Sequence, residues 1–188
     1  KFQDGTPVTA EDVKWSLDRV VTAPVLGMAQ LLTGSMTSAD QFKVIDPLTI
    51  EVTLPKPDKL ALPNLATVYP IIINSKLAKQ HATADDPWAT AWLKENTAGS
   101  GAYKIETFKP GEQVIMSRNT AWNRGTVDKS AFFKRVIVQS VPEPATRANL
   151  VERGDADIVV DLQASDVQSL EAKGKLKEVA GKITGDSK

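Results

Sequence analysis

The sequence predicts a mixed α/β fold (α+β), and three observations carry this prediction. Segments in which apolar and polar residues alternate, the pattern of half-buried strands, recur between segments with helical spacing of apolar residues. The order strand, helix, strand, helix, strand in the last third of the chain favours parallel pairing with right-handed crossovers. With 188 residues, the chain can form one large domain or two small lobes around a substantial core.

Composition and charge exclude several classes of function. The 23 basic and 23 acidic side chains balance, which argues against a nucleic acid or an anionic membrane held by bulk electrostatics. The absence of cysteine excludes disulfides, thiolate nucleophiles and cysteine metal sites. No apolar run approaches the ~18 residues of a membrane-spanning helix, and no signal peptide is recognisable.

The first half of the chain is predicted to alternate short helices and strands. Thr9 is a good N-cap for a helix over residues 10–21, and Asp12 forms a near capping box with it. Trp15 lies off the apolar stripe of this helix and is expected to pack on a second element. The further predicted elements are a short apolar segment (25–32), two strands (42–45 and 49–54), an irregular helix (60–66), a buried strand (69–73), a helix capped by Ser75 (75–82) and a helix with Trp88 and Trp92 on one face (88–95).

The second half begins with a hairpin that follows a glycine-rich entry at 99–101. Its strands are predicted over 103–108 and 113–118, and the turn between them contains Pro110 and Gly111. Proline presets φ at the first central position, and glycine takes the positive φ of the second. The elements expected after it are a strand (133–141), a helix that opens at Glu143–Pro144 and ends at Gly154, a strand (157–162), a helix capped by Ser165 and ended by Gly174, and a strand (176–180).

Three blocks of this sequence resemble the peptide/nickel-type (oligopeptide- and dipeptide-binding) extracellular solute-binding proteins of bacterial ABC importers. The central block, Gly99–Gly125, is similar to that family's segment G-[TS]-G-[PA]-Y, PGE, RN-x-x-[YW], G. Phe2–Arg19 resembles the signature F-x-DG-T-P-x-T-A-E-D-V-x-[FW]-S-[LF]-x-R, and Ala148–Ile158 resembles L-x-x-G-x-x-D-[IV]. The blocks keep the family's order and spacing and cover nearly the whole chain.

The resemblance implies a lobe of the periplasmic-binding-protein type II fold, with mixed sheets flanked by helices. The chain is expected to be a fragment that covers most of lobe one, with the second lobe absent. Residues 1–97 would form the accessory subdomain of lobe one, and residues 98–188 its main-sheet part. The resemblance also implies a periplasmic or extracytoplasmic location, with or without a membrane anchor.

The function implied by the resemblance is capture of a peptide, or of a related small solute, by closure of two lobes. The captured solute would then be delivered to the membrane permease of an ABC importer. The intact protein is expected to be a monomer. The chain alone is expected to bind weakly and to expose apolar surface that could drive self-association.

The resemblance places a ligand-contact segment after the first helix, where relatives often present an aromatic side chain. This sequence offers Val25, Met28, Leu31 and Leu32 there instead. Methionine and leucine would give an adaptable apolar wall, and plain core packing is the alternative for the same four residues.

Catalysis and metal binding find little support in the sequence. His81 is the only histidine and no G-x-S-x-G elbow accompanies it, which argues against a hydrolase. The acidic groups at 85–86 and 155–161 lack a twelve-residue calcium loop and are expected to be solvated or structural. No catalytic residue, metal or cofactor is therefore predicted.

Two further functions remain alternatives. The lobe could be the extracellular ligand-sensing domain of a signalling protein. It could also bind a non-peptide solute, since relatives handle nickel chelates, haem, opines and oligosaccharides.

Overall fold

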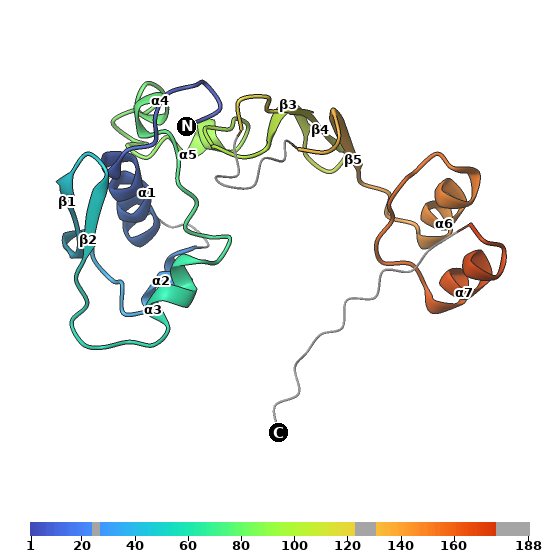
Figure 1. The fold of residues 1–188 in the computed structure, drawn as a ribbon, viewed down its shortest axis with the longest axis horizontal. Coiled ribbons are helices and arrows are strands. Elements are labelled where there is room, and N and C mark those ends of the chain that lie inside the picture. Colours follow the sequence, from blue (N-terminus) through green and yellow to red (C-terminus); the bar gives the residue numbers. More distant parts are fainter. Residues whose placement is uncertain (24–26, 123–130, 176–188) are drawn as a thin grey trace. The chain divides into compact units, whose positions relative to one another are not determined.

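The computed structural model describes residues 1–23, 27–122 and 131–175, and it confirms a mixed architecture of helices and small sheets (Figure 1). Contacts divide the chain into two compact units. The units are Lys1–Phe108 with Val114–Ile137 (unit 1) and Lys109–Gln113 with Val138–Lys188 (unit 2). The predicted subdomain division at residue 97 stays a prediction.

Helix α1 (Ala10–Thr22) forms the centre of unit 1. Thr9 caps it as predicted, and the capping box with Asp12 is complete. Its buried face packs into a core of aliphatic, methionine and phenylalanine side chains, which are Leu17, Val20, Val21, Leu31, Met36, Phe42 and Ala61. The predicted first helix and its apolar face are thus confirmed.

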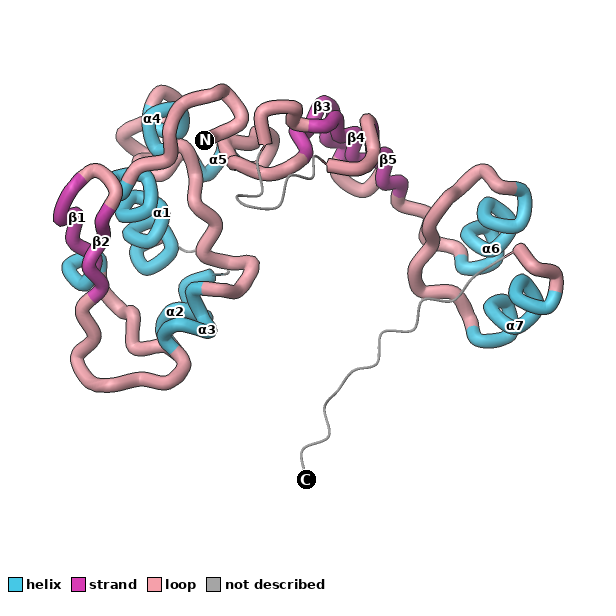
Figure 2. The backbone as a smooth tube through the Cα atoms, viewed as in Figure 1, coloured by secondary structure: helices cyan, strands magenta, loops and turns pink. Residues whose placement is uncertain are grey.

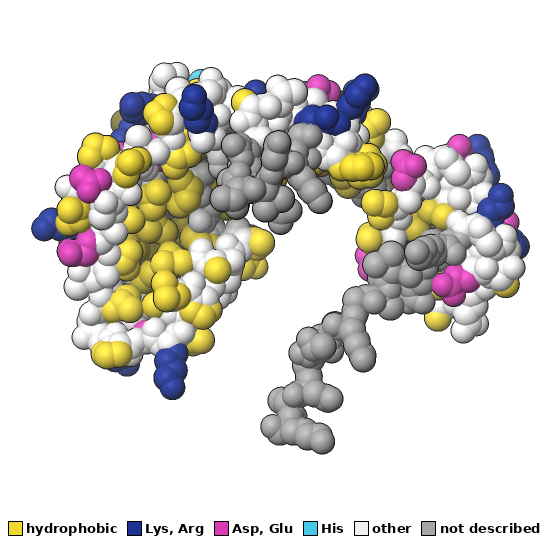
Figure 3. All heavy atoms as spheres, in the orientation of Figure 1, with side chains coloured by type: hydrophobic (Ala, Val, Ile, Leu, Met, Phe, Trp, Pro, Cys, Tyr) yellow, Lys and Arg dark blue, Asp and Glu magenta, His cyan; other side chains and the backbone are white. Residues whose placement is uncertain are grey.

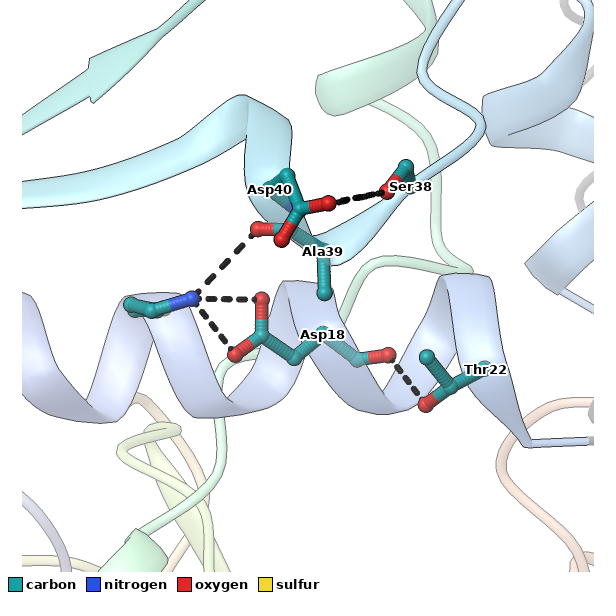
Figure 4. Close-up of polar contacts among 6 residues, drawn as sticks. Asp18, Thr22, Ser38, Ala39 and Asp40 are labelled. Carbon is teal, nitrogen blue, oxygen red and sulfur yellow. Dashed lines mark hydrogen bonds and ion pairs between the residues drawn. The ribbon is translucent and has the colours of Figure 1, made fainter.

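The hairpin of β1 (Phe42–Asp46) and β2 (Thr49–Val52) packs against α1. The strands are antiparallel, with Phe42 opposite Val52, and the predicted succession of strand, turn and strand is confirmed. A short 3-10 helix, η1 (Ala39–Gln41), leads into β1. Lys14 Nζ lies 2.8 Å from a carboxylate oxygen of Asp18, one turn further along α1. The same ammonium donates to the Ala39 carbonyl at 3.4 Å, and this hydrogen bond ties α1 to η1 (Figure 4).

The segment after the hairpin is less regular than the sequence predicts. Helix α3 (Ala61–Leu65) forms where a short helix was expected, but residues 69–73 form no strand. The amide of Ile73 donates to Ser16 Oγ at 2.9 Å instead of to a neighbouring strand. A strand needs a paired neighbour, and here α1 supplies the hydrogen-bond partner in its place.

Helices α4 (Ser75–Lys79) and α5 (Thr90–Leu93) complete the helical part of unit 1. The cap of α4 is Asn74, whose side chain accepts from the Leu77 amide, so the prediction of Ser75 as the cap is wrong by one residue. Both helices are shorter than predicted.

A second small core contains the predicted tryptophan pair. Trp15 packs against Trp88 with ring centroids 5.4 Å apart, which confirms that Trp15 meets a second element. Trp92 belongs to the same cluster, together with Ala78 and Ala89. Trp88 precedes α5, and Ala89 between them takes a positive φ of 49, so the prediction of one helical face with Trp88 and Trp92 is wrong although both side chains join this core.

A three-stranded sheet in the order β3-β4-β5 follows (Figure 2). Its strands are β3 (Tyr103–Lys109), β4 (Gln113–Arg118) and β5 (Arg135–Gln139). Gly111 takes φ +75 in the turn, and the Glu112 amide donates to the Lys109 carbonyl at 3.0 Å. The predicted hairpin and its glycine are confirmed.

Unit 2 contains helices α6 (Pro144–Arg153) and α7 (Ala164–Ala172), which pack on each other. Pro144 starts α6 and Gly154 ends it with φ +79, both as predicted. The predicted strand at 157–162 does not form, and the residue before α7 is Gln163 rather than the predicted cap Ser165. The predicted strand at 176–180 lies outside the described residues.

None of the helices over the described ranges is long and apolar enough to cross a membrane.

Candidate functional site

The predicted contact segment forms a short helix, α2 (Gly27–Leu32). Val25 lies outside the described residues. Met28, Leu31 and Leu32 all lie on α2, so the structure brings three of the four predicted residues together. The contact set itself stays a prediction.

The three side chains have different environments. Leu31 is 0% exposed and belongs to the core that α1 forms, so it anchors the helix. Met28 is half-buried and Leu32 is 43% exposed. Because Met28 and Leu32 are four residues apart, they are neighbours on one helical face. This face of α2 is open to solvent and is therefore reachable.

The reachable face of α2 is uncharged. The helix, Gly-Met-Ala-Gln-Leu-Leu, carries no acidic or basic side chain. Hydrophobic side chains also gather on the face of unit 1 that carries α1, α2 and α3 (Figure 3). The chemistry available there is apolar contact, which favours an apolar portion of a ligand over its charged groups.

Tyr69 adjoins the start of α2, although the sequence assigned it to a buried strand. A Cβ placed on Gly27 would come within 3.1 Å of Tyr69 Cβ, so the two backbones approach closely. Tyr69 is 45% exposed. A periodicity argument misses it, because an aromatic in an apolar run has the same pattern in a strand and in a loop.

The chain after α2 is held by a carboxylate. Ser35 takes a positive φ of 60 and its hydroxyl donates to Asp58, which also accepts from the Leu60 amide at 2.9 Å. The hydrogen bond from Ser35, followed by that from Leu60, lowers the pKa of Asp58 below its ordinary value. Asp58 therefore stays ionised at neutral pH and fixes the exit from α2.

The other candidate residues have structural surroundings. The imidazole of His81 is exposed and stacks on the indole of Trp92 with ring centroids 4.2 Å apart. Asp86 accepts from the Thr90 and Ala91 amides and so caps α5, and Asp155 pairs with Arg153 at 2.8 Å. Among the described residues no group of three potential metal ligands comes together.

A separate open hollow of about 150 Å³ lies between the end of α5 and β3. Its apolar lining comes from Leu93, Ile105 and Phe108, with Lys94 and Glu95 beside them. None of the α2 residues lines it, so it is distinct from the predicted contact segment.

Comparisons with known proteins agree with the resemblance. Residues 1–187 match the family of bacterial extracellular solute-binding proteins, family 5 (middle region). The chain is 34% identical over 176 residues to the probable D,D-dipeptide-binding periplasmic protein DdpA of Escherichia coli K12, which covers 94% of this chain and 32% of that protein.

Two solved structures share the fold. DppA of Helicobacter pylori, in complex with the peptide STSA, superposes with a TM-score of 0.70 at 22% identity over 87% of this chain and 32% of its own. MoaA of A. tumefaciens R10, in complex with mannopinic acid, gives 0.74 at 23% identity over 93% of this chain and 33% of its own.

The chain thus spans about a third of the length of these relatives. Because the family match extends over almost all of its residues, the chain belongs to the family-5 bacterial extracellular solute-binding proteins.

Proposed function

We propose that the intact protein captures a small solute, in the first instance a short peptide, between two lobes and delivers it to an ABC-type permease. The observation that carries this proposal is the family match over residues 1–187. The names of the relatives support a peptide, since DdpA is named for D,D-dipeptides and the H. pylori structure holds a tetrapeptide. The protein performs no chemistry on the solute, and it acts outside the cytoplasm.

Within this chain, Met28, Leu32 and Tyr69 form the apolar wall that receives the solute. Two of these side chains are more than two-fifths exposed, and the third is half-buried. Apolar side chains that remain accessible beside a packed core can gain free energy by burying a ligand, at about 25 cal/mol per Å². Because α2 carries no charge, the charged ends of a peptide would be held by groups elsewhere in the intact protein.

The wall can be tested by placing a charge on it. Leu32→Asp in the intact protein puts a carboxylate where an apolar part of the solute would lie. We expect the Kd for a dipeptide mixture, measured by calorimetry, to rise at least about tenfold, since a buried unpaired charge is costly.

The matched control is Leu48→Asp, because Leu48 is 84% exposed in the β1–β2 turn and is not part of the wall. It should leave the Kd unchanged. Equal affinities of Leu32→Asp and the unmodified protein would remove α2 from the binding site.

An opine is the second candidate solute, because the superposing MoaA structure holds mannopinic acid. A competition binding experiment distinguishes a peptide solute from an opine solute. A peptide solute should be displaced by other short peptides and not by mannopinic acid, whereas an opine solute should show the reverse.

A further inference from the structure

Asn64 is a buried polar residue that contacts the wall helix from a different element. It lies on α3 and is 5% exposed. Its backbone carbonyl accepts from the amide and hydroxyl of Thr67, so the backbone of Asn64 is fixed within its own segment. Helix α3 packs against α2, and the side chain of Asn64 makes hydrogen bonds to that neighbouring segment.

The Asn64 amide bridges two positions at the end of α2. Its Oδ1 accepts from Gln30 Nε2, and its Nδ2 donates to Thr33 Oγ1 at 2.9 Å. The Thr33 hydroxyl in turn donates to the Gln30 carbonyl at 2.7 Å. The buried Asn64 amide thus provides hydrogen-bond partners for the Gln30 side chain and for the Thr33 hydroxyl, which caps the last turn of α2.

Two glycines bring α2 close to its neighbours. A Cβ on Gly34 would lie 2.9 Å from Asn64 Nδ2 and 3.1 Å from Ala61 Cα. A Cβ on Gly27 would lie 3.1 Å from Val20 Cγ1. With this spacing the Asn64 amide reaches α2 directly, and α2 has little room to shift toward α1 or α3.

The helix needs such support because it has little stability of its own. Six residues fall well below the roughly 12–15 at which an isolated helix becomes marginally stable. Its buried residues, Gly27 and Leu31, share one face, so they hold α2 against the core but do not by themselves fix its rotation about its own axis. The hydrogen bonds of Asn64 lie on the same turn and oppose this rotation.

We propose that Asn64 is a positioning residue, which holds α2 in one orientation and thereby sets the preference of the wall for apolar solutes. The proposal rests on the proposed function of α2. Without Asn64, α2 would no longer hold Met28 and Leu32 in one orientation, and the wall would discriminate less between an apolar and a polar side chain.

The test compares three variants of the intact protein. Asn64→Leu removes both hydrogen bonds at similar volume. Gln30→Ala removes only the hydrogen bond between Gln30 and Asn64. Because Gln30 is half-buried, this is the milder change, and it serves if Asn64→Leu folds poorly. Asn119→Leu is the matched control, because Asn119 is also buried but bonds to Gly101 and Ala121, away from α2.

Two measurements are made on each variant. The first is hydrogen exchange at the amides of residues 27–33. The second is the ratio of Kd values for the dipeptides Ala-Ser and Ala-Leu, which a purely structural role would leave unchanged. We expect a ratio of roughly tenfold in the unmodified protein, the scale of burying a few apolar carbons.

Asn64→Leu should accelerate exchange on α2 and reduce the ratio to about threefold or less, and Gln30→Ala should shift both in the same direction by a smaller amount. Asn119→Leu should lower the melting temperature and change neither. Unchanged exchange on α2, or faster exchange with an unchanged ratio, would overturn the proposal. If the unmodified protein binds neither dipeptide nor any other peptide, the proposed function fails, and exchange alone then decides whether Asn64 holds α2.

Discussion

At the scale of single residues, Asp12 joins two helices through one carboxylate. It is 2% exposed and has four hydrogen-bond donors around it. Oδ2 accepts from the Thr9 amide and hydroxyl, at 2.9 and 2.7 Å, and Oδ1 accepts from the Ser75 amide and hydroxyl, at 3.0 and 2.7 Å. The same side chain therefore completes the start of α1 and holds the start of α4.

Removing this carboxylate should destabilise unit 1 strongly. Asp12→Ala leaves buried donors at Thr9 and Ser75 without an acceptor, and we expect a loss of about 2–4 kcal/mol in the free energy of unfolding. Urea denaturation at pH 7 measures it. Asp85→Asn is the control, because Asp85 is exposed. A loss below about 0.5 kcal/mol for Asp12→Ala would contradict the role given to Asp12.

The contribution of Asp12 should also depend on pH. Burial by itself raises the pKa of Asp12, but the hydrogen bonds from Ser75 and Thr9 outweigh it and the net pKa lies below the ordinary value. A lowered folded-state pKa contributes stability that is complete above the unfolded pKa of about 4 and is lost as the pH falls through the folded pKa. The stability difference between the unmodified chain and Asp12→Ala should therefore be constant from pH 5 to 7 and shrink below about pH 4. A difference that grows on acidification would contradict this assignment.

Half of this arrangement could be predicted from the sequence. Thr9 and Asp12 are three residues apart, so their capping box is a local signal. Ser75 is 63 residues away, and the sequence assigned it to cap its own helix. Long-range polar pairs such as Asp12–Ser75 and Gln30–Asn64 depend on how the elements pack, and no local pattern predicts them.

At the scale of elements, both hairpins, α1, α6 and β5 were predicted well, whereas α4 and α5 are shorter than predicted and two of the predicted strands do not form. Helices α1 and α6 and both hairpins have caps or turns in the local sequence, and they formed as expected. The segments 69–73 and 157–162 have strand-like composition, yet they form no strand. A strand exists only where a neighbour pairs with it, so composition alone cannot establish one.

The packing around α2 gives a test at this scale. Gly34→Ala adds a Cβ within 3.1 Å of three heavy-atom neighbours, and we expect it to cost about 1–3 kcal/mol. Gly99→Ala is the matched change, because a Cβ there would meet nothing within 4 Å, and it should be nearly neutral. Thermal denaturation compares the two. Equal melting temperatures would show that α2 has room to move and would weaken the case for a rigid wall.

At the scale of the whole molecule, the three-stranded sheet is incompletely covered. Every residue of β3, β4 and β5 is at least partly exposed. The adjoining Phe132 and Phe133 are both exposed and form an edge-to-face pair with centroids 4.9 Å apart. Exposed aromatic and aliphatic side chains of this extent favour association in water.

The chain by itself should therefore self-associate. We expect its sedimentation coefficient to rise with concentration, and the double change of Phe132 and Phe133 to serine to reduce that rise. Substitution of Leu48, an exposed leucine far along the chain in the β1–β2 turn, by serine is the control. A sedimentation coefficient independent of concentration would show that the exposed apolar surface does not drive association.

The central claim is solute capture by the intact protein, and native mass spectrometry of that protein tests it most directly. The protein is purified without unfolding and is measured beside this 188-residue chain. We predict a mass excess on the intact protein that resolves into short peptides and is missing from the chain alone. A single non-peptide adduct would keep the family and change the solute. An intact protein without any adduct, whose melting temperature is also unchanged by peptide mixtures, would contradict peptide capture.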